Sequence, residues 1–195
     1  MCHMKVLIVS ATKSEITSDK VMSFPVLITG VGMVNTAIGL TRKLSNSTFD
    51  LIINMGIAGS FTDSLKVGDI VEVAEDIFSE IGFEDGSDFS QFQDFEIPTS
   101  YKNESKTSLK KVIGITVNTV HGNEGSIEKI IDRLKPDIES MEGAVIFKIC
   151  KEFDIPCMQI RSISNKVERR NKENWDVNLA IKNLNIEVEK ILNKL

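Results

Sequence analysis

Residues 138–175 read IESMEGAVIFKICKEFDIPCMQIRSISNKVERRNKENW, and the other segments can be arranged around this stretch. An acidic turn at 138–142 leads into residues 143–153, which are apolar nearly all round and predict a buried helix. Residues 157–163 then predict a buried strand, and a polar loop leaves its carboxyl end. Because ligands of open α/β sheets bind outside the carboxyl ends of the strands, we expect this loop to border a ligand site.

Strands and helices alternate through the rest of the chain. Continuous hydrophobic runs, typical of strands buried on both faces, occur at residues 5–9, 25–29, 50–55, 70–74 and 112–117. Apolar positions at helical spacing predict helices at 33–44, 126–134 and from 175 to 195. We therefore expect one α/β domain over residues 1–195, with a central, mixed, largely parallel sheet flanked by helices.

Two segments carry more specific expectations. The predicted helix at 33–44 has one apolar face, which we expect to pack on the sheet: Val34, Ala37, Ile38, Thr41 and Leu44. Residues 79–108 show no sustained period and contain four phenylalanines, so we interpret them as a long excursion that docks on another surface, such as a second subunit.

Composition is that of an ordinary globular protein. The chain has 195 residues, 42 % hydrophobic and 26 % charged, with a net charge of −5 spread over interspersed acids and bases. It offers no basic block for nucleic acid or an anionic membrane, no apolar run of membrane-spanning length and no secretory signal. Cys2, Cys150 and Cys157 form no C-x-x-C pair, which favours free thiols in a reducing compartment, the cytoplasm.

Most common catalytic sets are missing. His3 and His121 are the two histidines, which disfavours a Ser-His-Asp triad or a histidine-rich metal site. The turn at residues 30–32 lacks the third glycine of a dinucleotide fingerprint, and there is no Walker A loop. We therefore expect neither a metal nor a cofactor. Polar side chains in loops that follow strands remain as candidates: Glu15, Asp76, Glu139, Glu142 and Asn165.

Five segments together resemble a known family. They are ITGVGMVNTAIGL, INMGIAGSF, VGDIVEVAED, ESMEGAVIFKICKEFDIPCMQIRSISN and ENWDVNLAI, and they occur in the order found in the purine nucleoside phosphorylase/uridine phosphorylase superfamily. The E-x-M-E-G and R-S-I-S-N runs are the specific signals. They resemble the nucleosidase branch, most closely the futalosine hydrolases of menaquinone biosynthesis. The resemblance implies a nucleoside phosphorylase-like three-layer fold, hydrolysis of a purine nucleoside's N-glycosidic bond, and a homodimer or higher homo-oligomer.

The resemblance also implies a role for each matched position. Glu15 stands where the family places the carboxylate that activates the attacking water, and Asn165 where a side chain addresses the leaving purine. Met141 matches a thioether packed on the ribose, Glu142 a carboxylate that accepts from ribose hydroxyls, and Trp175 an aromatic ring over the base. The other matched positions line the sugar and the base: Ile57, Ala58, Gly59, Asn118, Thr119, Val120 and Ser164.

Asn165 is a departure from the related methylthioadenosine/S-adenosylhomocysteine nucleosidases, which carry an aspartate here. An amide can donate to O6 of a purine while its carbonyl accepts from a protonated N7. Asn165 therefore favours a 6-oxopurine such as hypoxanthine, the base of futalosine. Because an amide is not an acid, we expect water or bulk solvent to supply the proton of the leaving base.

Other interpretations stay open. Glu15 and Glu142 also suit the first turns of helices, and Glu139 is either structural or paired with Arg161. A phosphorylase would need phosphate ligands in its first loop, whereas SATKSE at 10–15 has one lysine and a carboxylate, which favours hydrolysis. The alternative functions are a methylthioadenosine/S-adenosylhomocysteine or aminodeoxyfutalosine nucleosidase, and a non-catalytic nucleoside-binding protein.

Overall fold

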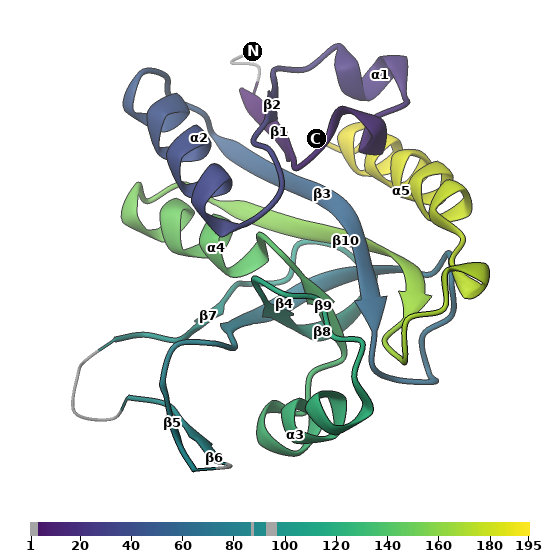
Figure 1. The fold of residues 1–195 in the computed structure, drawn as a ribbon. Coiled ribbons are helices and arrows are strands. Elements are labelled where there is room, and N and C mark those ends of the chain that lie inside the picture. Colours follow the sequence, from purple (N-terminus) through teal and green to yellow (C-terminus); the bar gives the residue numbers. More distant parts are fainter. Residues whose placement is uncertain (1–3, 87, 93–96) are drawn as a thin grey trace.

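The computed structural model describes residues 4–86, 88–92 and 97–195, in which strands and helices alternate along most of the chain (Figure 1). In chain order the elements are β1 (Val6–Ser10), η1 (Lys13–Glu15), α1 (Asp19–Met22), β2 (Val26–Ile28), α2 (Met33–Ser45), β3 (Leu51–Ser60), β4 (Ile70–Phe78), β5 (Phe83–Asp85), β6 (Asp88–Ser90), β7 (Ser100–Lys102), β8 (Lys110–Thr116), α3 (Glu124–Leu134), β9 (Ile138–Ser140), α4 (Gly143–Glu152), β10 (Cys157–Lys166), η2 (Lys172–Asn174) and α5 (Val177–Leu192).

The main sheet closes partly on itself. Its strand order is β10-β4-β8-β9-β3-β1-β2, with β7 paired to β4 and a further pairing between β10 and β3. Because β10 pairs with both β4 and β3, the strands β10, β4, β8, β9 and β3 form a ring, and β1 and β2 extend from it. Parallel pairings predominate, and β10–β4, β3–β9 and β4–β7 are antiparallel. The predicted mixed, largely parallel sheet is thus confirmed.

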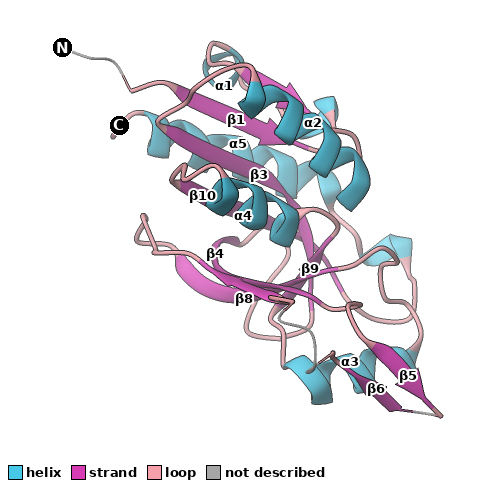
Figure 2. Cartoon of the chain, turned by 90° about the vertical axis from the view of Figure 1, so that its left-hand side faces the viewer, coloured by secondary structure: helices cyan, strands magenta, loops and turns pink. Residues whose placement is uncertain are grey.

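Helices cover both faces of the extended part of the sheet (Figure 2). α2 and α4 pack together on one face, where Leu7 and Ile52 contribute to a shared core. α5 packs on β10 and β3 from the other face, where Ile8 and Ile53 meet Leu184 and further residues of α5. Successive residues of a strand point to opposite faces, so a strand covered on both sides is hydrophobic without interruption. This explains the run at residues 5–9.

β3 and β4 are longer than their sequence patterns indicated. The hydrophobic run that predicted the third strand ended at residue 55, but residues 56–60 continue it as the second half of β3, and there they pair with β10 and β9. A glycine at 56 permits this because the Arg161 side chain lies against its α-carbon, where any larger residue would collide with it. The small residues therefore serve close packing within a strand rather than a change of direction.

α2 buries a different face from the one expected. Val34 is 69 % exposed and Ile38 is 53 % exposed, whereas Thr36, Leu40 and Leu44 are buried. Thr36 Oγ1 donates to Thr29 Oγ1 at 3.3 Å, which turns the Thr36/Leu40 side of the helix toward β2. The prediction was therefore correct for Leu44 and for Ala37, which packs against the core, and wrong for Val34, Ile38 and the exposed Thr41.

The excursion at 79–108 contains short strands of its own. β5 and β6 form a hairpin, β7 joins the main sheet beside β4, and the Phe89 ring lies 4.0 Å from the Arg133 guanidinium. Phe95 falls outside the described residues, as do Cys2 and His3. Docking of this segment on a second subunit stays a prediction. Among the described residues, no helix is both long and apolar enough to cross a membrane.

Candidate active site

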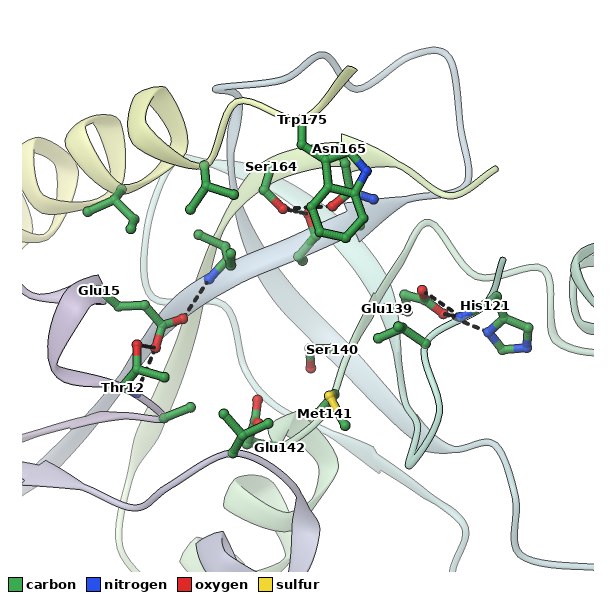
Figure 3. A pocket seen from close by; sticks show the side chains of 18 of the residues that line it. Thr12, Glu15, His121, Glu139, Ser140, Met141, Glu142, Ser164, Asn165 and Trp175 are labelled. Carbon is green, nitrogen blue, oxygen red and sulfur yellow. Dashed lines mark hydrogen bonds and ion pairs between the residues drawn. The ribbon is translucent and has the colours of Figure 1, made fainter. Parts of the chain in front are cut away.

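A cavity of about 350 Å³ opens at the carboxyl ends of β1, β3, β9 and β10 (Figure 3). This volume lies within the usual range of small-molecule sites, about 300–1,000 Å³. The cavity brings together predicted site residues from distant parts of the chain: Glu15, Ile57, Ala58, Gly59, Val120, Met141, Glu142, Ser164, Asn165 and Trp175. Glu15 and Asn165, which the proposed chemistry requires together, therefore share one cavity.

Asn118 and Thr119 do not line this cavity and are exposed. The backbone N–H and Nδ2 of Asn118 both donate to Glu80 Oε2, at 3.0 and 2.8 Å. After β8 the chain turns this side chain toward the excursion, and Val120 with His121 forms the cavity wall instead. The expected contact of Asn118 and Thr119 with a purine is not supported by this placement.

Glu15 is held in place by donors from its own loop and from β3. Oε2 accepts from Ser10 Oγ at 2.8 Å, from Thr12 N at 2.9 Å and from Thr12 Oγ1 at 3.1 Å. Oε1 accepts the Ile57 N–H at 3.2 Å. The sequence Thr-Lys-Ser-Glu is a capping-box pattern, in which the glutamate reaches back to the threonine N–H. Four donors thus orient a buried carboxylate at the cavity wall.

Glu142 immediately precedes α4, and its side chain is tied to the turn that follows β2. Its Oε1 accepts the Gly32 N–H at 2.8 Å, and Gly32 adopts the left-handed φ of 93° that a glycine tolerates. Burial raises the pKa of Glu142, and the Glu15 charge adds to the rise, while Arg161 and the Gly32 hydrogen bond act against it. The turn thereby fixes an acidic side chain at the opposite side of the cavity from Asn165 (Figure 3).

Arg161 is a cation beneath the site and is only 2 % exposed. The sequence left open a pairing of Arg161 with Glu139, but its hydrogen-bond acceptors are two amides. Nε donates to Gln159 Oε1 at 2.9 Å and Nη2 donates to Asn54 Oδ1 at 2.7 Å. Its guanidinium and Glu15 Oε1 both lie against Gly56. The neighbouring acids therefore balance its charge through space.

Asp76 lies deeper and does not line the cavity. It accepts from Thr116 Oγ1 at 2.8 Å and from Gln159 Nε2 at 3.0 Å. Burial raises the pKa of Asp76 to about 6, although these hydrogen bonds and the Arg161 charge oppose the rise. An Asp76–Gln159–Arg161 chain thus runs below the cavity and supports the residues around it.

Ser164 and Asn165 form one hydrogen-bonded unit. Ser164 Oγ lies within hydrogen-bond distance of Asn165 Oδ1, at 2.8 Å, and of the Ala58 carbonyl, at 3.2 Å. Asn165 Nδ2 donates to the Lys166 carbonyl at 2.9 Å, which uses one of its two N–H groups. The second N–H and the remaining lone pair of Oδ1 suit the edge of a heterocyclic base.

Thr12, His121 and Ser140 are among the lining residues that the sequence prediction missed. His121 Nδ1 lies 2.6 Å from Glu139 Oε2, so Glu139 pairs with this histidine and not with Arg161. Ser140 Oγ is buried and has no hydrogen-bond partner among the described residues, which leaves it available to a ligand. Within the described ranges, no group of three or more His, Cys, Asp or Glu could hold a metal ion. The sequence offered one signal for Ser140, namely that it directly precedes the predicted site residue Met141.

This architecture, with an acid-lined cavity at the carboxyl ends of its strands, is that of nucleoside phosphorylases and nucleosidases. A crystal structure of a Helicobacter pylori methylthioadenosine nucleosidase mutant with 5'-methylthioadenosine in its active site superimposes with a TM-score of 0.86, at 17 % identity, covering 99 % of this chain and 100 % of that one. The family model of the phosphorylase superfamily matches residues 23–195, and the chain belongs to that superfamily. This confirms the resemblance seen in the sequence.

Two sequence relatives carry different names within this family. A 5'-methylthioadenosine/S-adenosylhomocysteine nucleosidase of Maridesulfovibrio salexigens is 31 % identical over 157 residues, which are 71 % of this chain and 66 % of that protein, just under two thirds. A futalosine hydrolase of Thermus thermophilus is 24 % identical over 182 residues, 87 % of this chain and 81 % of that protein. Both relatives are named for hydrolysis of nucleosides, but their names differ in the substrate.

Proposed function

We propose that this N-glycosyl hydrolase cleaves a 6-oxopurine nucleoside with water, and that futalosine is its substrate and hypoxanthine its released base. The observation that carries the proposal is the placement of Glu15 and Asn165 on the walls of one cavity. A carboxylate at one end can activate water for attack on the anomeric carbon. An amide at the other end can bind the base that leaves.

Hydrolysis is favoured over phosphorolysis by the charge of the first loop. Glu15 lines the cavity, whereas Lys13, the one cation of that loop, is exposed and does not line it. A buried carboxylate in this position repels a phosphate dianion, but it accepts a proton from water. Such a positioned general base contributes about 10²–10⁴-fold to the rate.

The remaining contacts suit a nucleoside held between these two groups. Met141 and Glu142 lie together at the cavity floor (Figure 3). Trp175 also lines the cavity, and the next residue, Asp176, donates its backbone N–H to the Ser164 carbonyl at 3.0 Å. In the proposal Glu142 accepts from ribose hydroxyls, Met141 packs on the sugar and Trp175 covers the base. Holding the sugar in one orientation keeps its anomeric carbon in line with the water, which is worth several kcal/mol of the barrier.

Cleavage of a 6-aminopurine nucleoside is the second candidate. The relative with 31 % identity is named for methylthioadenosine and S-adenosylhomocysteine, which favours this alternative. Asn165 argues against it, because a 6-amino group is a donor and matches an acceptor better than an amide N–H. Aminodeoxyfutalosine is a further alternative substrate, and the assay described below tests it beside futalosine. A non-catalytic binding protein would not require Glu15.

The proposal includes a second copy of the chain, in a cytoplasmic homodimer. Val34 and Ile38 of α2 are largely exposed, and Val31, 49 % exposed, lies next to them and also lines the cavity. Apolar side chains gathered on one side of a helix favour contact with a protein surface. A second chain seated there would border the mouth of the cavity.

The proposed function is tested by incubating the protein with futalosine, inosine, aminodeoxyfutalosine and methylthioadenosine, each with and without phosphate. Release of hypoxanthine from futalosine without phosphate is the expected result. Adenine as the preferred product would instead support the second candidate. A requirement for phosphate would reject hydrolysis, and binding without release of base would indicate a non-catalytic protein.

A further inference from the structure

Glu139 and Asn165 lie on the two sides of Gly59 in the sheet. Gly59 of β3 is the register partner of Glu139 in antiparallel β9 and of Asn165 in parallel β10. A Cβ at Gly59 would lie 3.6 Å from Glu139 Cγ and 3.3 Å from Asn165 Nδ2. Adjacent strands are about 4.8 Å apart, so the two outer backbones are about 10 Å apart, and the Val167 side chain, with Cγ2 2.8 Å from the same Cβ position, packs beside Gly59. Because Gly59 has no side chain, the acid and the amide approach each other across β3, and both line the cavity.

Glu139 is joined to His121, and both line the cavity. Glu139 Oε2 lies 2.6 Å from His121 Nδ1, and Glu139 Oε1 accepts the His121 backbone N–H at 3.1 Å (Figure 3). The imidazole packs edge-on against the Phe61 ring, with centroids 5.9 Å apart, which holds its plane. Glu139 is only 4 % exposed. A carboxyl group in a short hydrogen bond with an imidazole can hold a proton and pass it on.

The proposed reaction needs a proton at this end of the cavity. The purine departs with the electron pair of its bond to the sugar, and the negative charge spreads over the ring. Asn165 has no acidic proton, and Glu15 takes a proton from the attacking water at the other end. We propose that the Glu139–His121 pair, and not bulk solvent, delivers a proton to N7 of the leaving 6-oxopurine. This inference rests on the proposed function.

Every atom and charge of this step has a place. The bond between the anomeric carbon and N9 breaks, and its electron pair stays on the base. The proton of Glu139 moves to N7, so the base leaves neutral, while the water oxygen bonds to the anomeric carbon and its proton moves to Glu15. His121 then returns a proton from Nδ1 to Glu139. Exchange with solvent resets both ends, and no oxidant or other reactant is needed.

A comparison of two kinds of substrate tests the proton donor. Inosine and futalosine need a proton on N7 to release a neutral base. Their N7-methylated forms already carry a positive ring, and their base leaves neutral without a proton. We expect Glu139→Gln to lower kcat for the unmethylated nucleosides by about 10²–10⁴-fold with little change in KM, and to leave kcat for the methylated nucleosides within about tenfold of the wild type.

Two further variants make the comparison specific. His121→Asn keeps a donor toward Glu139 but cannot replenish its proton, so we expect the same selective loss; this variant also tests the proposal if Glu139→Gln does not fold. Glu72→Gln is the matched control, because Glu72 is a buried glutamate bonded to Lys111 and Thr107 away from the cavity. Any effect of Glu72→Gln on kcat is expected to be equal for the methylated and the unmethylated nucleosides.

The outcomes separate this inference from the proposed function. Wild-type release of hypoxanthine with a loss confined to unmethylated substrates supports both. Wild-type release with an equal loss for both kinds of substrate, or with no loss, overturns the proton-donor assignment alone. If the wild type releases base from none of these nucleosides, the proposed function is overturned and the proton donor with it.

Discussion

Glu15 Oε1 accepts the Ile57 backbone N–H at 3.2 Å, which ties the first loop of the chain to the middle of β3. The two residues are distant in sequence, and the contact holds the acid against β3, which lines the cavity. The orientation of the carboxylate therefore depends on the strand as well as on its own loop, and the position that we propose for the attacking water depends on both.

Glu15→Gln is expected to lower the rate of base release by about 10²–10⁴-fold, because an amide cannot accept the proton of the attacking water. The change also places an NH₂ group against donors, which we expect to cost about 1–3 kcal/mol of unfolding free energy. Release of hypoxanthine and urea unfolding measure the two effects. Glu152→Gln, at an exposed site paired with Lys148, is the control. Full activity of Glu15→Gln would remove this residue from the mechanism.

Asn165→Asp is expected to shift preference from 6-oxopurine to 6-aminopurine nucleosides. A carboxylate accepts from the 6-amino group and repels O6, and one exchanged hydrogen bond changes the ratio of kcat/KM values by about 10–100-fold. Competition between futalosine and aminodeoxyfutalosine gives the ratio directly. Asn118→Asp, outside the cavity, is the matched control. An unchanged ratio in Asn165→Asp would contradict the assignment of specificity to this amide.

Asp76 is expected to make the free energy of unfolding depend on pH. Its folded pKa, about 6, lies above the ordinary value of 3.8, so the native state binds this proton more tightly than the unfolded chain does. Its stabilising contribution is therefore complete below about pH 4 and is lost as pH rises through 6, by about 3 kcal/mol. Urea unfolding of the wild type and Asp76→Asn between pH 4 and 8 measures this difference. Parallel curves would show that Asp76 does not titrate in this range.

Gly56→Ala is expected to lower the free energy of unfolding by about 1–3 kcal/mol and to reduce activity, because a methyl group there displaces the buried Arg161 side chain. Gly125→Ala is the matched control, since its nearest neighbour, Asn123 Oδ1, lies at an ordinary 3.5 Å and Gly125 is within the first turn of α3. The control should be neutral or stabilising by about 0.4–1 kcal/mol. Thermal and urea unfolding compare them, and an equally mild effect of both changes would argue against a tight Arg161–Gly56 contact.

Ile38→Lys is expected to dissociate the proposed homodimer, because it places a charge on the exposed apolar side of α2 at little cost to the monomer. Light scattering of the wild type and the variant measures the molecular mass. Lys43→Glu, which changes a charge on the same helix, tests whether charge alone alters assembly. A wild type that stays monomeric at high concentration would reject the second copy.

The local sequence pattern was enough to predict most helices and strands and the main residues of the cavity. Hydrophobic runs marked the buried strands because a strand covered on both faces has no solvent side. Glu15 follows β1 and Asn165 lies at the carboxyl end of β10, and the carboxyl ends of parallel strands lie at one edge of a sheet. β9 was missed because a strand of three residues is too short to show a period. The buried face of α2 was predicted wrongly because the helix has apolar residues on two faces. Only the face with Leu40 and Leu44 packs on the sheet.

The remaining features, which are the closed ring of strands and the partners of the buried side chains, depend on pairing between strands that are distant in sequence. β10 pairs with both β3 and β4, which closes the ring and sets Gly59 between Glu139 and Asn165. The choice of His121 as the partner of Glu139, and of amides as acceptors for Arg161, follows from which strands are neighbours. The chain carries the side chains in order, but distances between them arise only when separate strands pack together. For that reason a local pattern named the acid and the amide, and the folded molecule revealed the acid–imidazole pair beside the base site.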